Sequence, residues 1–237
     1  AAGIITQGAA ESWMGLTLAQ AIQPGLPFIM GGVYSVMDMS SMILAYGAPE
    51  LSLMMAGMTE LAHFAGVPLW QTGGCTDSKT FDEQAIIEGS LSAFFSALTA
   101  GDLCHDVGYT ESGLTGSVFQ LAAIDEAIGY SRRITRGIEV NDDTLAVDAI
   151  HKVGPNGHYL REKHTHRYYK TEFWYPNLCD RRNYEEWEMM GKTTMKDRTV
   201  ARVRDILATH KPSSVRSETE EAIRKALQEA EDRVKEG

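Results

Sequence analysis

The loop that follows the apolar run Val67–Trp70 gathers a thiol, hydroxyls, a carboxylate and an ammonium in one short stretch of chain. It begins with Gly73 and Gly74, which let the backbone turn sharply and leave room for a bound molecule. The polar side chains come next, ahead of a helical pattern: Cys75, Thr76, Asp77, Ser78 and Lys79. A strand, a glycine turn, polar side chains and a helix make up a βα unit, whose loop commonly carries function.

Each reactive group in this loop also has a structural interpretation. Asp77 and Lys79 suit a base and an electrophile, or a simple ion pair, and Asp77 or Asp82 suits the cap of the following helix. Lys79 is placed like a Schiff-base lysine, which needs desolvation to lower its pKa, although aldolase lysines usually lie on the strand itself. Cys75 suits a nucleophile, a metal ligand or a small filler of the core.

Two other glycine-containing loops follow apolar runs and carry groups of the same kind. The loop 31–47 contains Tyr34, Asp38 and Tyr46, together with methionines whose soft side chains suit an irregular core or a large partner. Glu111 lies in the loop after the expected strand that ends at residue 106. These loops therefore add aromatic rings and carboxylates to the first loop.

His105 and Asp106 stand at the end of the last of these runs. Side chains alternate along a strand, so we expect these two to point to opposite faces, with at most one facing a barrel interior. A zinc site that combines Cys75, His105 and Glu111 is conceivable, but no pair of these ligands has a diagnostic spacing. We therefore expect neither a bound metal nor a tightly bound cofactor.

The elements that must position these loops read as four βα units in succession. The expected strands cover residues 3–6, 26–30, 67–70 and 102–106, and the expected helices cover residues 9–23, 48–64, 82–100 and 117–135. Such an alternation predicts an α/β fold with parallel strands and right-handed helical crossovers. Polar loops after every strand favour a TIM barrel, whereas an open doubly wound sheet lacks its GxGxxG fingerprint here. Four strands cannot close an eight-stranded barrel, so we expect about the C-terminal half of a TIM (β/α)8 barrel.

The amino-acid composition of the chain changes after the fourth expected helix. We expect residues 1–150 to form the half-barrel and residues 151–237 to form a mostly helical C-terminal extension, with charged helices near 182–209 and 217–235. A net charge of -10 over 237 residues argues against nucleic-acid binding, because contact with phosphates needs basic surface. No apolar run is long and clean enough to span a bilayer. Three widely spaced cysteines form no disulfide framework and fit a reducing cytoplasm.

An ordered series of segments runs through the whole chain: GGVYSVMDM, YGAPEL, GGCTDSKTFDEQA, YTESGL, VGPNGHYLREKHT and EFWYPNL. In order and spacing it resembles the trimethylamine:corrinoid methyltransferase family, and it matches the C-terminal half of a member. The resemblance implies a TIM barrel that moves a methyl group from a methylated amine to Co(I) of a separate small corrinoid protein. Founding members carry pyrrolysine at a position that falls at or beside Cys75, whereas this chain has none.

Because pyrrolysine is absent, the resemblance favours a quaternary amine such as glycine betaine over a tertiary amine. A quaternary amine already carries a good leaving group and needs a cage, an anchor and an in-line approach to cobalt. We expect Tyr34 and Tyr46 to supply cation–π contact and Lys79 to anchor a carboxylate. We expect Cys75 and Thr76 to contact the substrate, and Asp38, Asp77, His105 and Glu111 to act as catalytic groups.

Other functions remain open at this point. The chain is also compatible with a non-catalytic or incomplete half-barrel subunit that needs another chain. A Schiff-base aldolase that uses Lys79 on the same barrel is a weaker third possibility. As partners we expect a small methylated amine, the cognate corrinoid protein and further copies of the chain, in the cytoplasm.

Overall fold

The structure is a computed structural model that describes residues 1–236 of the chain. It divides into two compact units, Ala1–Val203 and Arg204–Gly237. The first unit contains the sheet and the candidate site, and the second contains the end of α9 (Met195–Thr209) and all of α10 (Ser217–Glu236). Among residues 1–236, no helix combines the length and the apolar composition that crossing a membrane requires.

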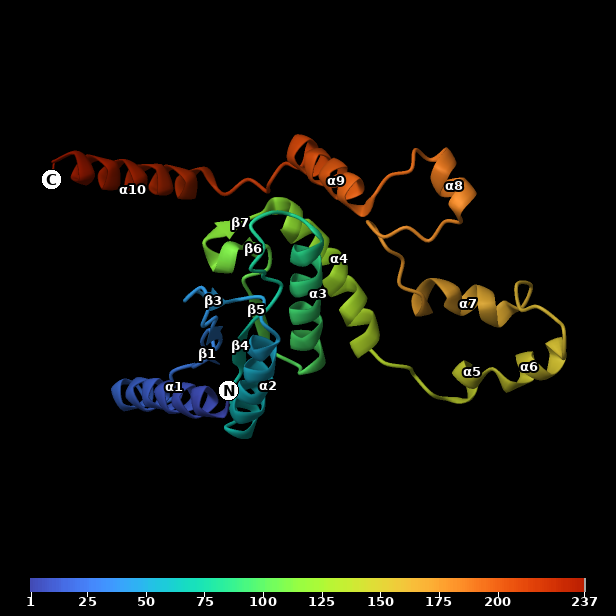
Figure 1. The fold of residues 1–237 in the computed structure, drawn as a ribbon, viewed down its shortest axis with the longest axis horizontal. Helices are drawn as coiled ribbons and strands as arrows, with labels where there is room; N and C mark the ends of the chain where they lie inside the picture. Colours follow the sequence, from blue (N-terminus) through green and yellow to red (C-terminus); the bar gives the residue numbers. More distant parts are fainter. Residues whose placement is uncertain (237) are drawn as a thin grey trace. The chain divides into compact units, whose positions relative to one another are not determined.

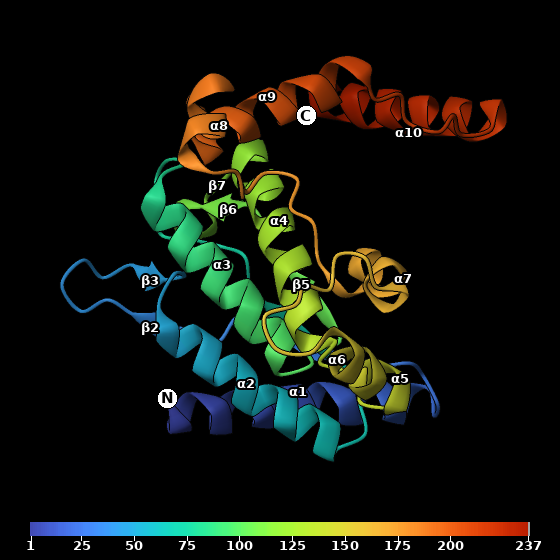
Figure 2. The ribbon, with the colours of Figure 1, turned by 90° about the vertical axis from the view of Figure 1, so that its right-hand side faces the viewer.

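A small parallel sheet organises the first unit (Figure 1). Its strands are neighbours in chain order: β1 (Met30–Gly31), β4 (Leu69–Thr72) and β5 (Leu103–His105). Helix α2 (Pro49–Phe64) lies between β1 and β4 in the chain, and α3 (Glu83–Leu98) lies between β4 and β5. Helix α4 (Val118–Thr135) follows β5 and packs against α3 (Figures 1 and 2). Three of the four predicted βα units are thus confirmed, although β1 is shorter than predicted.

The helices of these three units begin within one residue of the expected positions. Pro49 opens α2 at a position where its missing N–H leaves no hydrogen bond unmade. The Asp82 side chain caps α3 by accepting the Ala85 N–H at 2.9 Å. Ser117 caps α4 in the same way.

The first predicted unit is wrong, because residues 3–6 belong to α1 (Ala2–Ile22) and not to a strand. A short apolar run fits either a strand or one face of a helix. Here Ile5, Gly8 and Ala9 share a helical face, on which Gly8 and Ala9 are buried. Ile5 approaches α2 so closely that a Cβ on Gly57 would lie 2.8 Å from its Cδ1 atom. Packing against α2 therefore decides the helical outcome.

Short antiparallel pairs interrupt two of the loops. In the loop after β1, β2 (Val36–Met37) pairs with β3 (Leu44–Ala45). In the loop after β5, β6 (Tyr109–Thr110) pairs with β7 (Thr115–Gly116) around the 3-10 turn Glu111–Gly113. These hairpins give defined backbone structure to segments that the sequence showed only as long polar loops.

The C-terminal part of the first unit consists of short helices. They are α5 (Asp142–Leu145), α6 (Val147–Val153), α7 (Lys163–Glu172) and α8 (Tyr184–Met189). The single helix predicted over 182–209 is wrong, because the chain breaks after α8. Gly191 and Lys192 adopt left-handed backbone angles there, with φ +94 and +54. Thr194 and Asp197 then exchange hydrogen bonds that start α9 afresh.

The two faces of the sheet have different environments. Met30, Leu69 and Gln71 point toward the helices, and the Gln71 amide donates to Thr59 of α2 and to Thr99 at the end of α3. This side continues into the main apolar cluster: Ala9, Met30, Tyr46, Leu51, Met55, Met58, Ala62, Leu69 and Cys75. On the opposite face, Trp70 and Leu103 are 50% and 49% exposed. The sheet is therefore packed against helices on one face, whereas the other face is open around Trp70 and Leu103.

Candidate functional site

The loops after β1, β4 and β5 meet at the carboxyl ends of these strands. The Asp77 carboxylate accepts the backbone N–H groups of Tyr46 at 2.7 Å and Gly47 at 2.9 Å. It also accepts the Ser112 hydroxyl at 2.9 Å. One side chain of the middle loop thus holds both neighbouring loops together at the strand ends.

Further hydrogen bonds, to Glu88, fix the position of Asp77 itself. Its backbone N–H donates to Glu88 of α3 at 2.9 Å, and the Thr76 hydroxyl donates to the same carboxylate oxygen. Glu88 lies so close to Gly47 that a Cβ there would stand 2.2 Å from a carboxylate oxygen. Because both Asp77 oxygens are occupied by N–H and O–H donors, the arrangement suits a brace between loops more than a free base.

A second connection joins four side chains across the same strand ends. The Thr72 hydroxyl lies 3.2 Å from His105 Nε2, and His105 Nδ1 lies 2.7 Å from Asp106 Oδ1. The other Asp106 oxygen accepts the phenol of Tyr46. A continuous path of polar contacts thus leads from β4 through β5 to the start of α2. We refer to Thr72, His105, Asp106 and Tyr46 as the strand-end cluster.

The strand-end cluster corrects the expectation that His105 and Asp106 point to opposite faces. Alternation holds only while the backbone stays extended, and Asp106 has φ +70 in the left-handed region. The chain folds back at Asp106, so its carboxylate returns to the imidazole of the preceding residue. Glu111 and Ser112, with φ +52 and +54, are strained in the same sense. Backbone strain of this kind concentrates at functional sites.

Burial sets the ionisation of two groups beneath the site. Tyr46 is 7% exposed, and its burial, followed by its hydrogen bond to Asp106, raises the pKa of the phenol well above its usual value. Cys75 is fully buried, and burial raises the pKa of its thiol in the same direction. Its sulfur lies 3.6 Å from the Tyr46 carbonyl. The thiol is neutral and packed in the apolar cluster, which favours the filler interpretation over a nucleophile.

The other predicted site residues lie apart from the strand-end cluster. Asp38 is exposed in the β2–β3 hairpin, where it accepts from Ser40 at 2.7 Å. These bonds lower the pKa of the Asp38 carboxyl. Tyr34 directs its phenol to Ser12 and to the Gly31 carbonyl, each at 3.1 Å.

Lys79 and Glu111 stand at the rim of the converging loops. The Lys79 ammonium is exposed and donates to the Asp77 carbonyl at 2.8 Å. The exposure supplies none of the desolvation that a Schiff-base lysine needs. Glu111 accepts the Thr115 hydroxyl at 2.7 Å, and its backbone N–H donates to Ser78 at 2.8 Å. Both residues therefore remain near the site without joining its hydrogen-bonded centre.

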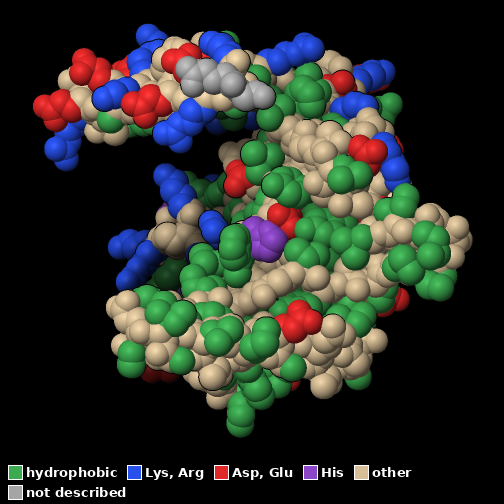
Figure 3. All heavy atoms as spheres, turned by 90° about the vertical axis from the view of Figure 1, so that its left-hand side faces the viewer, with side chains coloured by type: hydrophobic (Ala, Val, Ile, Leu, Met, Phe, Trp, Pro, Cys, Tyr) green, Lys and Arg blue, Asp and Glu red, His purple; other side chains and the backbone are tan. Residues whose placement is uncertain are grey.

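Aromatic surface lies beside the strand-end cluster on the uncovered face of the sheet. The rings of Trp70 and His105 meet edge to face, with centroids 4.7 Å apart. Tyr109, in the loop after β5, is 43% exposed. Figure 3 shows apolar side chains gathered around a histidine and acidic groups, on the side where α1 and β3 lie in Figure 1. Such a surface suits a ligand that is both cationic and apolar.

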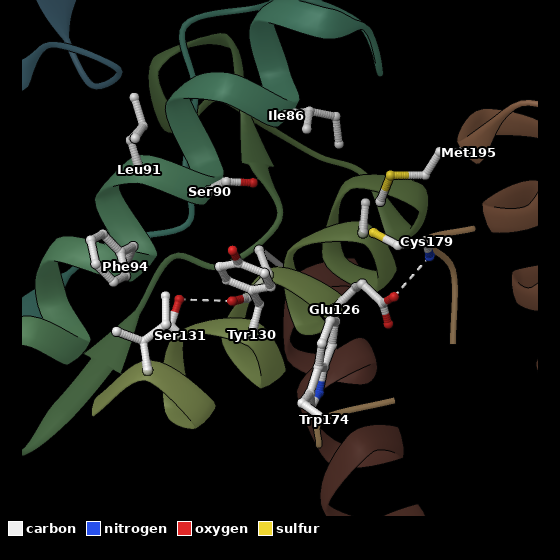
Figure 4. Close-up of a pocket in the computed structure, with 13 residues that line it drawn as sticks. Ile86, Ser90, Leu91, Phe94, Glu126, Tyr130, Ser131, Trp174, Cys179 and Met195 are labelled. Carbon is white, nitrogen blue, oxygen red and sulfur yellow. Dashed lines mark hydrogen bonds between the residues drawn. The ribbon is translucent and has the colours of Figure 1, made fainter. Parts of the chain in front are cut away.

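A separate apolar cavity of about 350 Å³ lies between α3, α4 and the chain near residue 174 (Figure 4). Tyr130 and Trp174 meet edge to face there, with centroids 5.6 Å apart. Other side chains that line it include Ile86, Leu91, Phe94 and Met195. None of its lining residues belongs to the strand-end cluster. The cavity is therefore a feature of the helical layer and not of the strand ends.

Comparison with known proteins decides the family. The family described as "Trimethylamine methyltransferase (MTTB)" matches residues 1–234. The chain belongs to the trimethylamine methyltransferase family. It is 37% identical to a glycine betaine methyltransferase of Desulfitobacterium hafniense (strain Y51), over 90% of this chain and 45% of that protein. It is 32% identical to the trimethylamine methyltransferase MttB of Desulfitobacterium hafniense (strain DSM 10664 / DCB-2), over 98% of this chain and 46% of that protein.

A third member of the trimethylamine methyltransferase family, MttB1 of Methanosarcina acetivorans, is 32% identical over 88% of this chain and 42% of its own length. The chain therefore spans just under half the length of these relatives. The resemblance seen in the ordered segments of the sequence is confirmed at the level of the family.

Several residues of the site in this family member escaped the sequence analysis. Asp106 was expected on the face opposite His105, and Thr72, Glu88 and Trp70 were not singled out. A signal for Asp106 does exist, because Val107-Gly108 follows it and aspartate tolerates the left-handed conformation of a turn. The contacts of Thr72 and Glu88 join segments far apart in the chain, and no local pattern marks them.

Within residues 1–236, the structure brings together no three histidine, cysteine, aspartate or glutamate side chains that could hold a metal ion. His105 and Asp106 contribute one imidazole and one carboxylate, and each already has a second protein partner. The strand-end cluster offers a carboxylate, an imidazole, a phenol and a hydroxyl, and the rings of Trp70 and Tyr109 lie beside it.

Proposed function

We propose that the chain is the C-terminal half of a methyltransferase that demethylates a quaternary amine such as glycine betaine. The methyl group would pass to Co(I) of the corrinoid held by a separate protein. Membership of the family and the names of its relatives support the class of reaction. The absence of pyrrolysine from the sequence supports a quaternary over a tertiary amine.

The observation that carries this proposal is the strand-end cluster together with the aromatic surface beside it. A quaternary ammonium cannot donate a hydrogen bond, so it is recognised by aromatic faces and by nearby negative charge. Trp70 and Tyr109 provide exposed aromatic surface, and Asp106 provides a carboxylate held close to the His105 ring. Tyr46 stays neutral beneath them, because its pKa is raised by burial. These groups would hold the cation at the strand ends.

The chemical demands on the protein are modest. Co(I) supplies the nucleophile that takes the methyl group, and the neutral tertiary amine leaves without prior activation. The protein must orient one methyl group in line with the acceptor and exclude competing geometries. Lys79, at the rim of the loops, remains the candidate anchor for the substrate carboxylate. Its exposed ammonium would have to leave the Asp77 carbonyl to do so.

For the fold, we propose a half-barrel that another segment completes. Three parallel strands in chain order, each followed by a helix, support a barrel over a doubly wound sheet, in which the strand order reverses. The half-exposed Trp70 and Leu103 on the uncovered face support a further layer of strands opposite them. The same face also suits the alternative, an incomplete or non-catalytic half-barrel subunit that pairs with another chain.

The test uses the full-length natural protein with its reduced corrinoid partner protein. Methylation of cobalt, followed by absorbance, is expected with glycine betaine or another quaternary amine and not with trimethylamine. A lack of methylation with every quaternary amine would remove this function. The mass of the intact natural chain separates the half-barrel subunit from a longer enzyme.

A further inference from the structure

We propose that Asp106 is the positioning residue of this site, holding the Tyr46 phenol and the His105 imidazole in fixed relation through a single carboxylate. The inference rests on the proposed function and deepens it. It adds a residue that orients the imidazole beside the aromatic surface and the phenol beneath it, and that does not itself react.

The two Asp106 oxygens contact different side chains. One oxygen contacts His105 Nδ1 at 2.7 Å, and the other accepts the phenol of Tyr46. A carboxylate only accepts hydrogen bonds, so the Tyr46 phenol must donate, and a proton on His105 Nδ1 would make the second contact attractive. Tyr46 therefore keeps its proton, and the proposed arrangement places a proton on His105 Nδ1. Nε2 is left to accept the Thr72 hydroxyl at 3.2 Å.

Burial favours the arrangement in which both Asp106 oxygens have partners. The Asp106 side chain is 10% exposed and the His105 side chain is 24% exposed. In such surroundings an unpaired carboxylate is costly, so the cluster favours the one arrangement that satisfies both oxygens. The raised pKa of Tyr46 agrees with a phenol that stays protonated next to this carboxylate.

The backbone conformation of Asp106 also favours its contacts with His105 and Tyr46. With φ +70, Asp106 occupies a conformation that asparagine, aspartate and glycine tolerate better than other residues. An extended residue at this position would carry its side chain away from His105. The strained backbone is therefore what brings the carboxylate to the ring of its own neighbour.

The role differs from that of Asp77, which also joins loops. The partners of Asp77 are two backbone N–H groups and one hydroxyl, so it fixes the path of the chain. The partners of Asp106 are the polar ends of two rings, so it fixes side-chain orientation. Removal of Asp77 should therefore act on stability, whereas removal of Asp106 should act on the geometry presented to substrate.

The experiment compares wild type, Asp106→Asn and Asp106→Gly in the full-length natural protein. Asparagine keeps the shape and the left-handed backbone but no longer offers two anionic acceptors. Glycine keeps only the backbone freedom. Asn156→Gly is the matched control, because Asn156 also has a positive φ, of 62, and lies outside the site.

The first measurement is the nitrogen NMR spectrum of protein labelled in the histidine rings, with His105 assigned by its loss in His105→Gln. Wild type should show a proton on Nδ1 and none on Nε2, and Asp106→Asn should change this distribution. A wild-type signal from the Nε2-protonated form, or an unchanged signal in Asp106→Asn, would overturn the proposal whether or not methyl transfer is found.

The second measurement is the rate of cobalt methylation at varied glycine betaine concentration. Both Asp106 variants should lose about 10- to 100-fold in kcat/KM, mostly through kcat, because small misplacement of reacting groups is costly. The unfolding midpoint of Asp106→Asn should stay close to that of Asn156→Gly, because the asparagine carbonyl can still accept the Tyr46 phenol. Unchanged kcat in a variant with an altered His105 signal would reduce Asp106 to a structural brace and end the proposal. If wild type methylates no cobalt at all, the proposed function fails, and the His105 signal alone decides the positioning.

Discussion

The carboxylate of Asp77 accepts the backbone N–H of Gly47 at 2.9 Å, which ties the loop after β4 to the entry of α2. The same carboxylate reaches Tyr46 and Ser112, so three segments depend on one side chain. If the carboxylate is removed, the N–H groups of Tyr46 and Gly47 and the Ser112 hydroxyl lose their acceptor. The order of the loops that carry the site therefore depends on the Asp77 carboxylate.

Asp77→Ala should lower the free energy of unfolding by about 2–4 kcal/mol, because it leaves several partly buried donors without an acceptor. The measurement is chemical unfolding of the full-length natural protein. Asp38→Ala is the matched control, since Asp38 accepts comparable bonds in an exposed hairpin, and it should cost clearly less. Equal losses in the two variants would contradict the role of Asp77 as a brace.

Asp102 should make stability depend on pH. Its carboxylate accepts the Leu69 N–H at 2.8 Å, and this bond, ahead of the contact with His63, lowers the pKa of Asp102 below its usual 3.8. A lowered pKa means that the stabilisation is fully present above 3.8 and is lost as the pH falls through the folded value. Asp102→Asn should therefore be less stable than wild type at pH 7, and the difference should shrink with acidification. Unfolding curves at several pH values check this, and a difference that grows toward low pH would refute it.

Glu126 should hold the chain after α7 against α4. This buried carboxylate accepts three consecutive backbone N–H groups, those of Asn177, Leu178 and Cys179, at 2.8–3.0 Å. Glu126→Gln should cost about 1–3 kcal/mol, because the amide group cannot accept all three. Amide hydrogen exchange should rise at residues 177–179.

Glu172→Gln provides the control for this variant. Glu172 pairs with Arg133 at 3.3 Å, but its side chain is 41% exposed, and exposed pairs contribute little. It should leave exchange at 177–179 unchanged. If exchange there rises equally in both variants, Glu126 is not the anchor.

Local signals in the sequence predicted the helices that carry the site better than they predicted the site itself. Pro49, Asp82 and Ser117 mark the starts of α2, α3 and α4 because capping depends on residues adjacent in the chain. Residues 3–6 failed, because an apolar run of that length does not distinguish a strand from a helix that packs on α2.

The chemistry of the site depends on contacts that no local pattern records. Tyr46 and Asp106 are 60 positions apart, and their hydrogen bond requires a left-handed Asp106 backbone. Cys75 and Lys79 stand in one loop, yet one is fully buried and the other exposed. Which side chain of a polar loop turns inward is decided by the neighbouring loops, which the sequence of the loop does not contain.

Lys79 separates two of the functions that the sequence left open. As a carboxylate anchor, it needs only to reach the substrate from the rim, and a charge-assisted contact there would be worth about 1.5–3 kcal/mol, or about ten- to a hundredfold in affinity. Lys79→Met in the full-length natural protein should therefore weaken the apparent affinity for glycine betaine by that factor and leave the unfolding midpoint unchanged. Lys192→Met is the control, because Lys192 is an exposed lysine paired with Glu188 outside the site.

Borohydride reduction in the presence of small aldehydes should leave Lys79 unmodified, since its exposed ammonium lacks the desolvation that favours a Schiff base. Unchanged betaine affinity in Lys79→Met would remove this residue from the site, and a reduced adduct on Lys79 would favour the aldolase alternative.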